Sequence, residues 1–237
     1  MRIFELSPRL RSVADLVPQG SRFADIGTDH AYLPVWLILQ GKLEGAIATD
    51  LREGPLNRAR QTAEDHGVTG QISLRLCDGL SGIGPEEVDT ISIAGMGGET
   101  IAEILSAAPW TGQGSRRLLL QPMTAHAELR AWLNRHGFCI TGETLTSEDK
   151  TLYSTFLVVP GQDSPLTPGE VWAGRQETGA QDPLRGRYLD KLIHRAERAL
   201  EGLRRSTKTA DIPRCAELEK VVPELIKMKE AWAAWQP

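Results

Sequence analysis

Short apolar runs alternate with helix-like segments along residues 1–160. The apolar runs have the length of buried strands: Phe23–Ile26, Ala46–Thr49, Ile72–Leu76, Thr90–Ala94 and Leu118–Leu120. The segments between or before them have helical character and are 8–17, 31–40, 53–66, 99–107 and 125–135. Alternation of strand and helix predicts a parallel sheet with helices on both faces.

Two further runs end this part of the chain. Phe138–Leu145 and Leu152–Val159 are separated only by residues 146–151, so they are expected to pair as an antiparallel hairpin at one edge of the sheet. The fold class predicted for residues 1–160 is therefore α/β, with a Rossmann-like, mostly parallel sheet.

The pattern changes after Pro160. Residues 161–169 are rich in proline and glycine and are expected to be a linker. Apolar residues then recur at intervals of three and four positions over 184–203 and again over 218–235. A break at 206–213, which ends in Pro213, separates the two segments. This spacing predicts two antiparallel amphipathic helices, which can lie as a short coiled coil. We therefore expect two domains, 1–160 and 161–237.

Composition excludes several classes of protein. With 41% hydrophobic and 24% charged residues, the chain is globular rather than disordered. No apolar run approaches the roughly 18 residues of a membrane span, and the N-terminal residues lack a signal-peptide pattern. Cys77, Cys139 and Cys215 are too far apart for a disulfide framework or a zinc site. We expect a cytoplasmic protein, monomeric or weakly homo-oligomeric, with no membrane partner and no required metal.

Charge is unevenly distributed. The formal net charge is −4, yet residues 185–214 contain nine lysines and arginines against four acidic residues. A basic stripe of this kind can bind a phosphate backbone. A solvated helix face is the alternative interpretation, and charge alone favours it.

The turn after the first strand carries chemistry. In Asp25-Ile-Gly-Thr-Asp-His30, Gly27 directly follows a buried strand and lets a ligand approach the backbone. A dinucleotide site would need two more glycines, where Asp29 and Tyr32 stand instead. Asp29 would repel a pyrophosphate, so NAD and FAD are excluded. An acidic turn suits a positively charged ligand such as S-adenosylmethionine.

The next strands also end in acidic or glycine-rich turns. Asp50 can accept both hydroxyls of a ribose, and Asp78, followed by Gly79, can accept from an adenine amino group. Each aspartate alone is equally consistent with a helix cap or a turn. Because parallel strands end at one edge of the sheet, the set together predicts an adenosine-bearing cationic cofactor. The candidate cofactor-binding residues are Asp25, Gly27, Asp29, Asp50, Asp78, Gly79, Ala94 and Gly95.

The loop that follows the fourth strand is glycine-rich. The glycines of Ala94-Gly-Met-Gly-Gly98 leave room for a flat substrate and expose backbone N–H groups. A tight strand-to-helix turn is the alternative explanation.

These stretches resemble the bacterial tRNA (adenine-22) N1-methyltransferase family (TrmK). The resemblance covers residues 4–160, whereas 161–237 resemble the family only as a helical extension. The matching stretches are Leu6-Ser-Pro-Arg-Leu10, Val17-Pro18-x-Gly20, Ala24-Asp-Ile-Gly-Thr-Asp-His-Ala-Tyr-Leu-Pro34, Asp50 with Gly54-Pro55-Leu56, Arg75-Leu76 with Asp78-Gly79-Leu80, Val88-Asp-Thr-Ile91 with Ala94-Gly-Met-Gly-Gly98, Leu120-Gln-Pro-Met123, Leu129-Arg-x-Trp-Leu133 and Glu148-Asp149.

The resemblance implies S-adenosylmethionine as cofactor and the adenine at tRNA position 22 as target. Methyltransferases that act on the adenine amino group usually carry Asn/Asp-Pro-Pro-aromatic after strand four, which Ala94-Gly-Met-Gly97 lacks. That difference fits a ring-nitrogen target, whose lone pair attacks directly once the base has left its stack.

Roles for individual residues follow as hypotheses. Asp29 is the first choice for stabilising positive charge as it moves to the base. His30 and Arg9 are candidates to orient the base or contact phosphate, although His30 can equally make a structural hydrogen bond. Core packing is at least as good an explanation for two of the candidate substrate residues, Tyr32 and Met96. The candidate catalytic residues are Asp29, His30 and Arg9, and the candidate substrate-binding residues are Arg9, Tyr32, Met96, Gly97, Gly98, Arg195, Arg198 and Arg205.

Two other functions fit the same sequence. A methyltransferase for a small molecule or a protein would keep the cofactor site and leave the basic stripe unexplained. A non-catalytic RNA-binding module would leave Asp29, Asp50 and Asp78 without a purpose.

Overall fold

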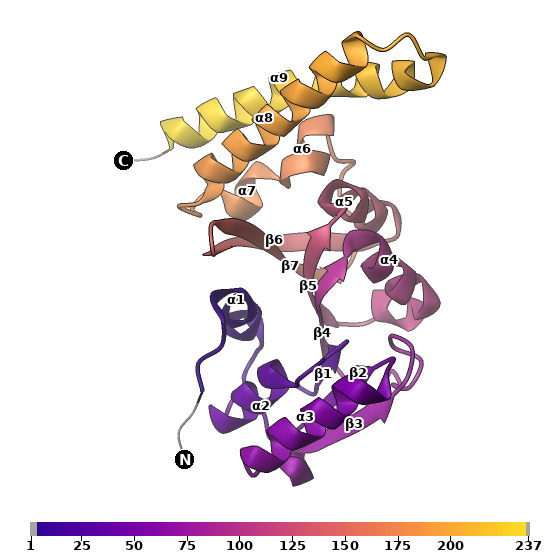
Figure 1. Ribbon diagram of the computed structural model, residues 1–237, viewed down its shortest axis with the longest axis vertical. Coiled ribbons are helices and arrows are strands. Elements are labelled where there is room, and N and C mark those ends of the chain that lie inside the picture. The colour runs from indigo at the N-terminus through magenta and orange to yellow at the C-terminus, as the bar shows by residue number, and fades with distance from the viewer. Residues whose placement is uncertain (1–3, 236–237) are drawn as a thin grey trace.

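The computed structural model describes residues 4–235 and contains one seven-stranded sheet (Figure 1). The strand order is β3-β2-β1-β4-β5-β7-β6, in which β3, β2, β1, β4 and β5 are parallel and β7 and β6 are antiparallel. The strands are β1 (Phe23–Ile26), β2 (Ala46–Asp50), β3 (Ile72–Leu76), β4 (Thr90–Gly97), β5 (Arg117–Thr124), β6 (Phe138–Glu148) and β7 (Thr151–Pro160). The predicted mostly parallel sheet with an antiparallel edge is confirmed.

Helices cover both faces of this sheet. On one face, α1, α2 and α3 pack against Phe23 and Ala48, and on the other, α4 and α5 pack against Ile26 and Ile93. The central strands are buried on both sides, which explains why they are nearly continuous apolar runs. These helices are α1 (Pro8–Leu16), α2 (Tyr32–Leu39), α3 (Glu53–Asp65), α4 (Gly98–Ala107) and α5 (His126–Arg135), with 3₁₀ turns at η1 (Thr69–Gln71) and η2 (Pro109–Gly112).

The edge hairpin is longer than its sequence suggests. The expected six-residue connection at 146–151 is wrong, because β6 continues to Glu148 and β7 begins at Thr151. The turn consists of Asp149 and Lys150, both in the left-handed region with φ of 48° and 68°. Two left-handed residues give a tight turn whose twist matches that of the strands, so the ladder extends to its tip.

Four helices follow the sheet, and sequence periodicity found only the two long ones. They are α6 (Pro168–Ala173), α7 (Gln176–Gly179), α8 (Arg185–Arg204) and α9 (Ile212–Ala234), with a 3₁₀ turn η3 (Thr209–Asp211) before α9. The linker is shorter than expected because Thr167 and Glu170 form a capping box that starts α6. The antiparallel pair α8 and α9 is confirmed, but Pro213 lies in the first turn of α9 rather than in the break.

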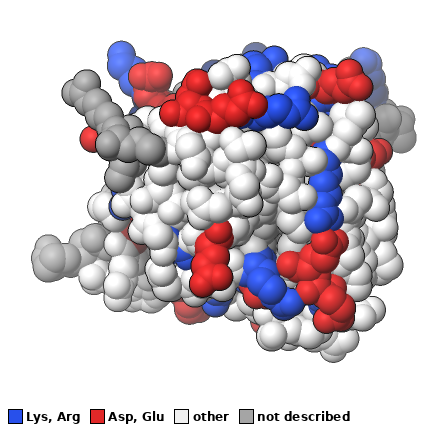
Figure 2. Space-filling model, turned by 90° about the horizontal axis from the view of Figure 1, so that it is seen from below, with Lys and Arg blue, Asp and Glu red and all other residues white. Residues whose placement is uncertain are grey.

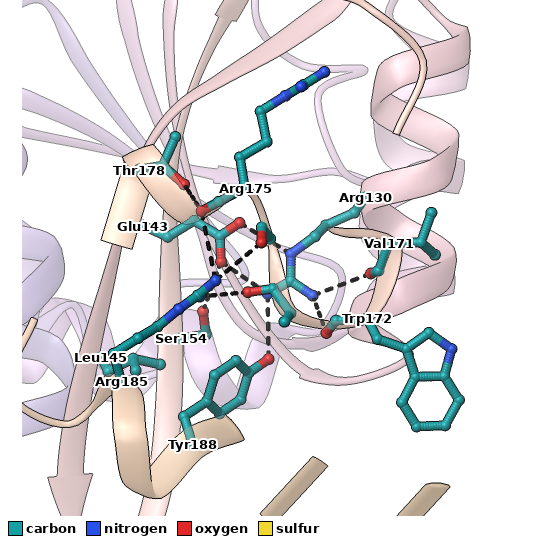
Figure 3. A network of polar contacts seen from close by, with 12 residues as sticks. Arg130, Glu143, Leu145, Ser154, Val171, Trp172, Arg175, Thr178, Arg185 and Tyr188 are labelled. Carbon is teal, nitrogen blue, oxygen red and sulfur yellow. Dashed lines mark hydrogen bonds and ion pairs between the residues drawn. The ribbon is translucent and has the colours of Figure 1, made fainter. Parts of the chain in front are cut away.

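A buried ion pair joins these helices to the sheet (Figure 3). Arg130 of α5 is fully buried, and its Nη2 lies 2.8 Å from Oε2 of Glu143 on β6. Arg130 also donates to the carbonyl oxygen of Trp172 in α6 at 2.8 Å and to the hydroxyl of Tyr188 in α8 at 3.2 Å. Burial lowers the pKa of the Arg130 guanidinium, but Glu143 more than offsets this and leaves that pKa raised. One charged side chain thus ties α5, β6, α6 and α8 together.

The end of the molecule remote from α8 and α9 has no concentrated charge. Figure 2 shows both acidic and basic side chains around the rim of this end, with a broad uncharged area between them. Within residues 4–235, no helix is long and apolar enough to cross a membrane.

Candidate active site

A cleft of about 980 Å³ opens at the carboxyl ends of the parallel strands. It is bounded by the turns after β1, β2, β3 and β4 and by one face of α4. The topology therefore brings together most of the residues expected to bind a cofactor. Those that line the cleft are Gly27, Asp29, Asp50, Asp78, Gly79, Ala94 and Gly95, and Met96, a candidate substrate-binding residue, lines it too.

The turn after β1 is shaped by close contact with the loop after β4. Gly27 has a φ of +69°, and a Cβ built on it would lie 2.0 Å from the Cε of Met96. Asp29 and Ala31 are also left-handed, with φ of 51° and 54°, which is uncommon for residues other than glycine. The left-handed conformation thus favours glycine at position 27, and a side chain there would displace the terminal methyl group of Met96.

Asp25 lies beneath this turn and does not line the cleft. Its side chain is buried, and its Oδ2 accepts a 2.7 Å hydrogen bond from the hydroxyl of Thr28. Burial raises the pKa of the Asp25 carboxyl to about 6. The structure therefore places Asp25 where it supports the turn rather than where it contacts a ligand.

Asp50 and Asp29 both line the cleft as neighbours but have different surroundings. Asp50 is buried, and its carboxylate accepts backbone N–H groups from Arg52 at 3.1 Å and Asp29 at 3.4 Å. The Asp29 side chain is 57% exposed and forms an ion pair with Arg58 of α3. Asp78 is exposed at the end of β3. Of these three aspartates, one is thus fixed by backbone hydrogen bonds and two are accessible from solvent.

Several cleft residues were not identified from the sequence. Arg58 was missed because its contact with Asp29 depends on how α3 packs. Four residues of α4 share one helix face toward the cleft, and their three-and-four spacing after the glycine loop was an available signal. They are Thr100, Glu103, Ile104 and Ala107.

Two aromatic rings stack beside the turn after β1. The rings of His30 and Tyr32 lie 5.0 Å apart and within 4° of parallel, and Tyr32 is 43% exposed. Phe4 packs against Tyr32 at 5.6 Å between ring centroids, and Nε2 of His30 lies 3.7 Å from Oδ2 of Asp29. Neither His30 nor Tyr32 lines the cleft, but together they present a flat surface next to Asp29.

Glycine stands at several positions of the loop after β4, for a different structural reason at each. A Cβ on Gly98 would lie 2.4 Å from the carbonyl oxygen of Ala125, so close packing against the end of β5 requires glycine there. A Cβ on Gly97 would lie 3.2 Å from the hydroxyl of Thr124. Gly95 has a φ of +79° and lines the cleft beside the guanidinium of Arg9. Among these glycines, Gly95 is the one placed for a ligand.

The predicted RNA-contacting arginines lie on α8, outside the cleft. Arg195 stacks over the ring of Trp172 at 5.0 Å, and Arg198 is exposed. Arg205 follows the last residue of α8 and pairs with Glu201 one turn earlier. Their side chains therefore differ in how free they are to meet a phosphate.

Comparison with known proteins assigns the chain first to a class and then to a family. A family model described as a methyltransferase domain matches residues 6–156. The tRNA (adenine(22)-N(1))-methyltransferase of Bacillus subtilis is 40% identical over 161 residues, which are 68% of each protein. The chain belongs to this methyltransferase family.

Solved structures agree over nearly the full length. The B. subtilis M1A22 tRNA methyltransferase TrmK has a TM-score of 0.84 and 30% identity, covering 95% of this chain and 99% of that one. Streptococcus pneumoniae Sp1610 in complex with S-adenosyl-L-methionine is 33% identical with a TM-score of 0.78, covering 92% and 100%. Mycoplasma capricolum TrmK in complex with S-adenosyl-homocysteine is 28% identical with a TM-score of 0.78, covering 98% and 100%.

Proposed function

We propose that this protein transfers the methyl group of S-adenosylmethionine to N1 of adenine 22 in bacterial tRNA. The observation that carries the proposal is the set of carboxylates at successive strand ends, Asp29, Asp50 and Asp78, gathered around one cleft in a chain of this family. S-adenosylmethionine is the cofactor of the family's methyltransferase domain, and its positive sulfonium and ammonium suit an acidic cleft.

The residues present fit each part of that cofactor. The fixed carboxylate of Asp50 suits the two ribose hydroxyls, and the exposed Asp78 suits the adenine amino group. Gly27 and Gly95 keep side chains away from the amino-acid end. Leu51 lines the cleft and is 65% exposed, so it offers an apolar surface to a flat ring. When bound, the cofactor supplies an activated methyl group.

The target base enters from the side of the aromatic stack. N1 lies on the Watson–Crick edge, so the adenine leaves its helix before reacting. The stacked rings of His30 and Tyr32 provide a surface for the extruded base. In the transfer, the N1 lone pair forms the new N–C bond while the S–C bond breaks and its electron pair stays on sulfur. The products are S-adenosylhomocysteine and a positively charged N1-methyladenosine.

Asp29 is placed to assist this movement of charge. Its carboxylate lies between the aromatic stack and the cleft, so it can stabilise positive charge as it moves from sulfur to the base. N1 of neutral adenine is already nucleophilic, so the step requires neither a strong general base nor a metal ion. The division into domains 1–160 and 161–237, a cytoplasmic location and a monomeric or weakly associated state remain predictions.

The experiment that tests the proposal identifies the modified nucleoside. The purified protein is incubated with labelled S-adenosylmethionine and an unmodified tRNA transcript that has adenine at nucleotide 22. A matched transcript, in which guanine replaces that one adenine, is treated in the same way. After digestion, label is expected in N1-methyladenosine from the first transcript only. Label in both transcripts would place the target elsewhere. Binding of cofactor with no label in any RNA would favour a small-molecule or protein substrate.

A further inference from the structure

The amino-acid tail of S-adenosylmethionine carries an α-carboxylate, which needs a positive partner in an otherwise acidic cleft. The basic residues that line the described cleft are Arg52 and Arg58, both on the α3 side. Arg58 is already paired with Asp29. The opposite side, between the turns after β1 and β4, is lined by Gly27, Asp29, Gly95 and apolar residues and has no cation of its own among the described residues, so a cation serving it would come from behind the glycines.

Arg9 of α1 occupies that position. Its Nη1 lies 3.4 Å from where a Cβ on Gly95 would be, and Gly95 has none. The guanidinium is thus separated from the cleft by a residue without a side chain. Among the described residues, no carboxylate oxygen lies within 4.0 Å of this guanidinium. Arg9 therefore forms no direct ion pair with a described residue, although its charge acts on the buried Asp25 carboxyl, and it keeps unused N–H donors beside the cleft.

Gln121 of β5 fixes Arg9 in place. Gln121 is fully buried, and its Oε1 accepts a 2.9 Å hydrogen bond from Nη1 of Arg9. Its Nε2 donates to the carbonyl oxygen of Arg9 at 3.0 Å and to the hydroxyl of Thr155 at 2.9 Å. Glu148 accepts the backbone N–H of Arg9 at 3.0 Å. One buried amide thus holds both the backbone and the head group of Arg9.

We propose that Arg9, oriented by Gln121, binds the α-carboxylate of the cofactor's amino-acid tail. This assignment rests on the proposed function and gives Arg9 a different ligand from the base or phosphate that the sequence suggested for it. A phosphate would be expected to meet an exposed and adaptable cation. Arg9 is instead half-buried, held by a buried side chain and placed directly beside the cleft. Gln121 is a positioning residue, because it acts through Arg9.

The test compares two ligands that differ in the tail. S-adenosylhomocysteine carries the carboxylate, whereas 5′-methylthioadenosine keeps the nucleoside and the sulfur but has no amino-acid tail. Their affinities are measured by calorimetry for the full chain and for Arg9→Gln and Arg9→Lys. We expect Arg9→Gln to weaken S-adenosylhomocysteine about tenfold to a hundredfold, with 5′-methylthioadenosine unchanged within about twofold. Arg9→Lys is expected to fall between, because it keeps the charge and loses the planar fork.

Arg11→Gln is the matched control, since it removes the same charge from the same helix. Arg11 is exposed and pairs with Asp15, away from the cleft, so both affinities should stay within about twofold of wild type. For Gln121 the variants are Gln121→Leu, which removes the contact, and Gln121→Glu, which keeps its shape but pairs with Arg9. Both variants should weaken binding only of the ligand that has the tail. The double variant Arg9→Gln with Gln121→Leu should lose little more affinity than Arg9→Gln alone.

Three outcomes would overturn the assignment. Equal loss for both ligands would mean that Arg9 supports the cleft as a whole. Unchanged S-adenosylhomocysteine affinity with a raised KM for tRNA would mean that Arg9 meets the RNA. Failure of the wild-type protein to bind either ligand would overturn the proposed function as well, and only that result affects both.

Discussion

The carboxylates of Asp50 and Asp29 line the same cleft but are held very differently. Asp50 is buried and accepts two backbone N–H groups, so its position is set by the main chain. Asp29 itself has a left-handed backbone conformation. Its side chain is largely exposed and forms an ion pair with Arg58. A fixed acceptor is suited to binding a ligand, and an exposed one next to the aromatic stack is suited to the reacting base.

This difference predicts a division of labour. Asp50→Ala is expected to weaken S-adenosylmethionine binding by about tenfold or more, because a buried carboxylate that accepts ribose hydroxyls is lost. Asp29→Ala is expected to lower kcat more than it lowers cofactor affinity. Calorimetry gives the affinities and single-turnover methylation gives the rate of transfer. The interpretation of Asp29 fails if the two quantities fall by the same factor.

Asp25 predicts a pH dependence of stability. Its folded-state pKa of about 6 lies above the ordinary 3.8, so the fold favours the protonated carboxyl. The contribution of this group to stability is fully present below the unfolded pKa and is lost as pH rises through about 6. Asp25→Asn should therefore match wild type near pH 4 and exceed it above pH 7 by on the order of 1–3 kcal/mol.

Urea unfolding between pH 4 and pH 8 measures this difference. Asp65→Asn is the control, because Asp65 is exposed at the end of α3. A gap between Asp25→Asn and wild type that does not change with pH would mean that hydrogen bonding at the turn, not ionisation, sets the effect.

Cleft residues that directly follow a strand could be predicted from the sequence. Residues that come to the cleft from neighbouring helices or through side-chain contacts could not. Gly27, Asp50 and Asp78 could be placed from the sequence because parallel strands end at one edge. Asp25 was expected among the ligand contacts but is buried beneath the turn after β1. The pattern of polar and apolar residues along this strand does not indicate which polar side chain is buried. Arg58 and Gln121 depend on side-chain contacts between elements far apart in sequence.

At the scale of elements, the long periodic segments were predictable and the short ones were not. The helices α3, α5 and α8 follow their apolar spacing closely, whereas α9 begins at Ile212, within the predicted break. The helix α7 spans only Gln176–Gly179, too few residues to show a period. The tip of the β6–β7 hairpin was missed because its turn residues, Asp149 and Lys150, lack the glycine that usually marks such a turn.

The ion pair between Arg130 and Glu143 predicts how the C-terminal helices are held. Arg130→Met should destabilise the protein by about 3–5 kcal/mol, because it leaves a buried carboxylate without a partner. Arg130→Met combined with Glu143→Leu should recover much of that loss, since no charge then remains buried. Chemical unfolding measures both variants. Equal destabilisation by the single and double variants would show that packing, not charge, dominates this junction.

At the scale of the whole molecule, α8 separates its charges into two flanks. Basic residues recur at intervals of four, four and three positions along one flank: Arg187, Lys191, Arg195 and Arg198. The acidic residues Asp190, Glu197 and Glu201 lie on the other, where Asp190 pairs with Lys229 of α9. Sequence counting could give the total charge of this region but not this separation, which depends on helical register.

The basic flank leads from α8 toward the cleft. Arg187 donates to the carbonyl oxygen of Lys150 at 2.9 Å, in the same hairpin whose Glu148 holds the backbone of Arg9. Burial, together with the charges of Arg130, Arg195 and Lys191, lowers the pKa of His126, at the start of α5, to about 4. The flank thus faces both β6–β7 and the N-terminus of α5, next to the end of β5.

This arrangement divides the three arginines predicted to contact tRNA. Arg195 and Arg198 lie on the basic flank, whereas Arg205 is paired with Glu201, as its neighbour Arg204 is with Glu219. The variants Arg195→Gln with Arg198→Gln and Arg204→Gln with Arg205→Gln each remove two charges from the same region. The first pair should weaken tRNA binding at low salt about tenfold and reduce the slope of log K against log salt by about 2.

The second pair should have a clearly smaller effect, because its charges are already neutralised within the protein. Filter binding at several salt concentrations measures the slope, and calorimetry with S-adenosylhomocysteine should give wild-type affinity for both pairs. Equal losses from the two pairs would mean that total charge draws the RNA to the whole hairpin. No loss from the first pair would remove the basic flank from the tRNA path.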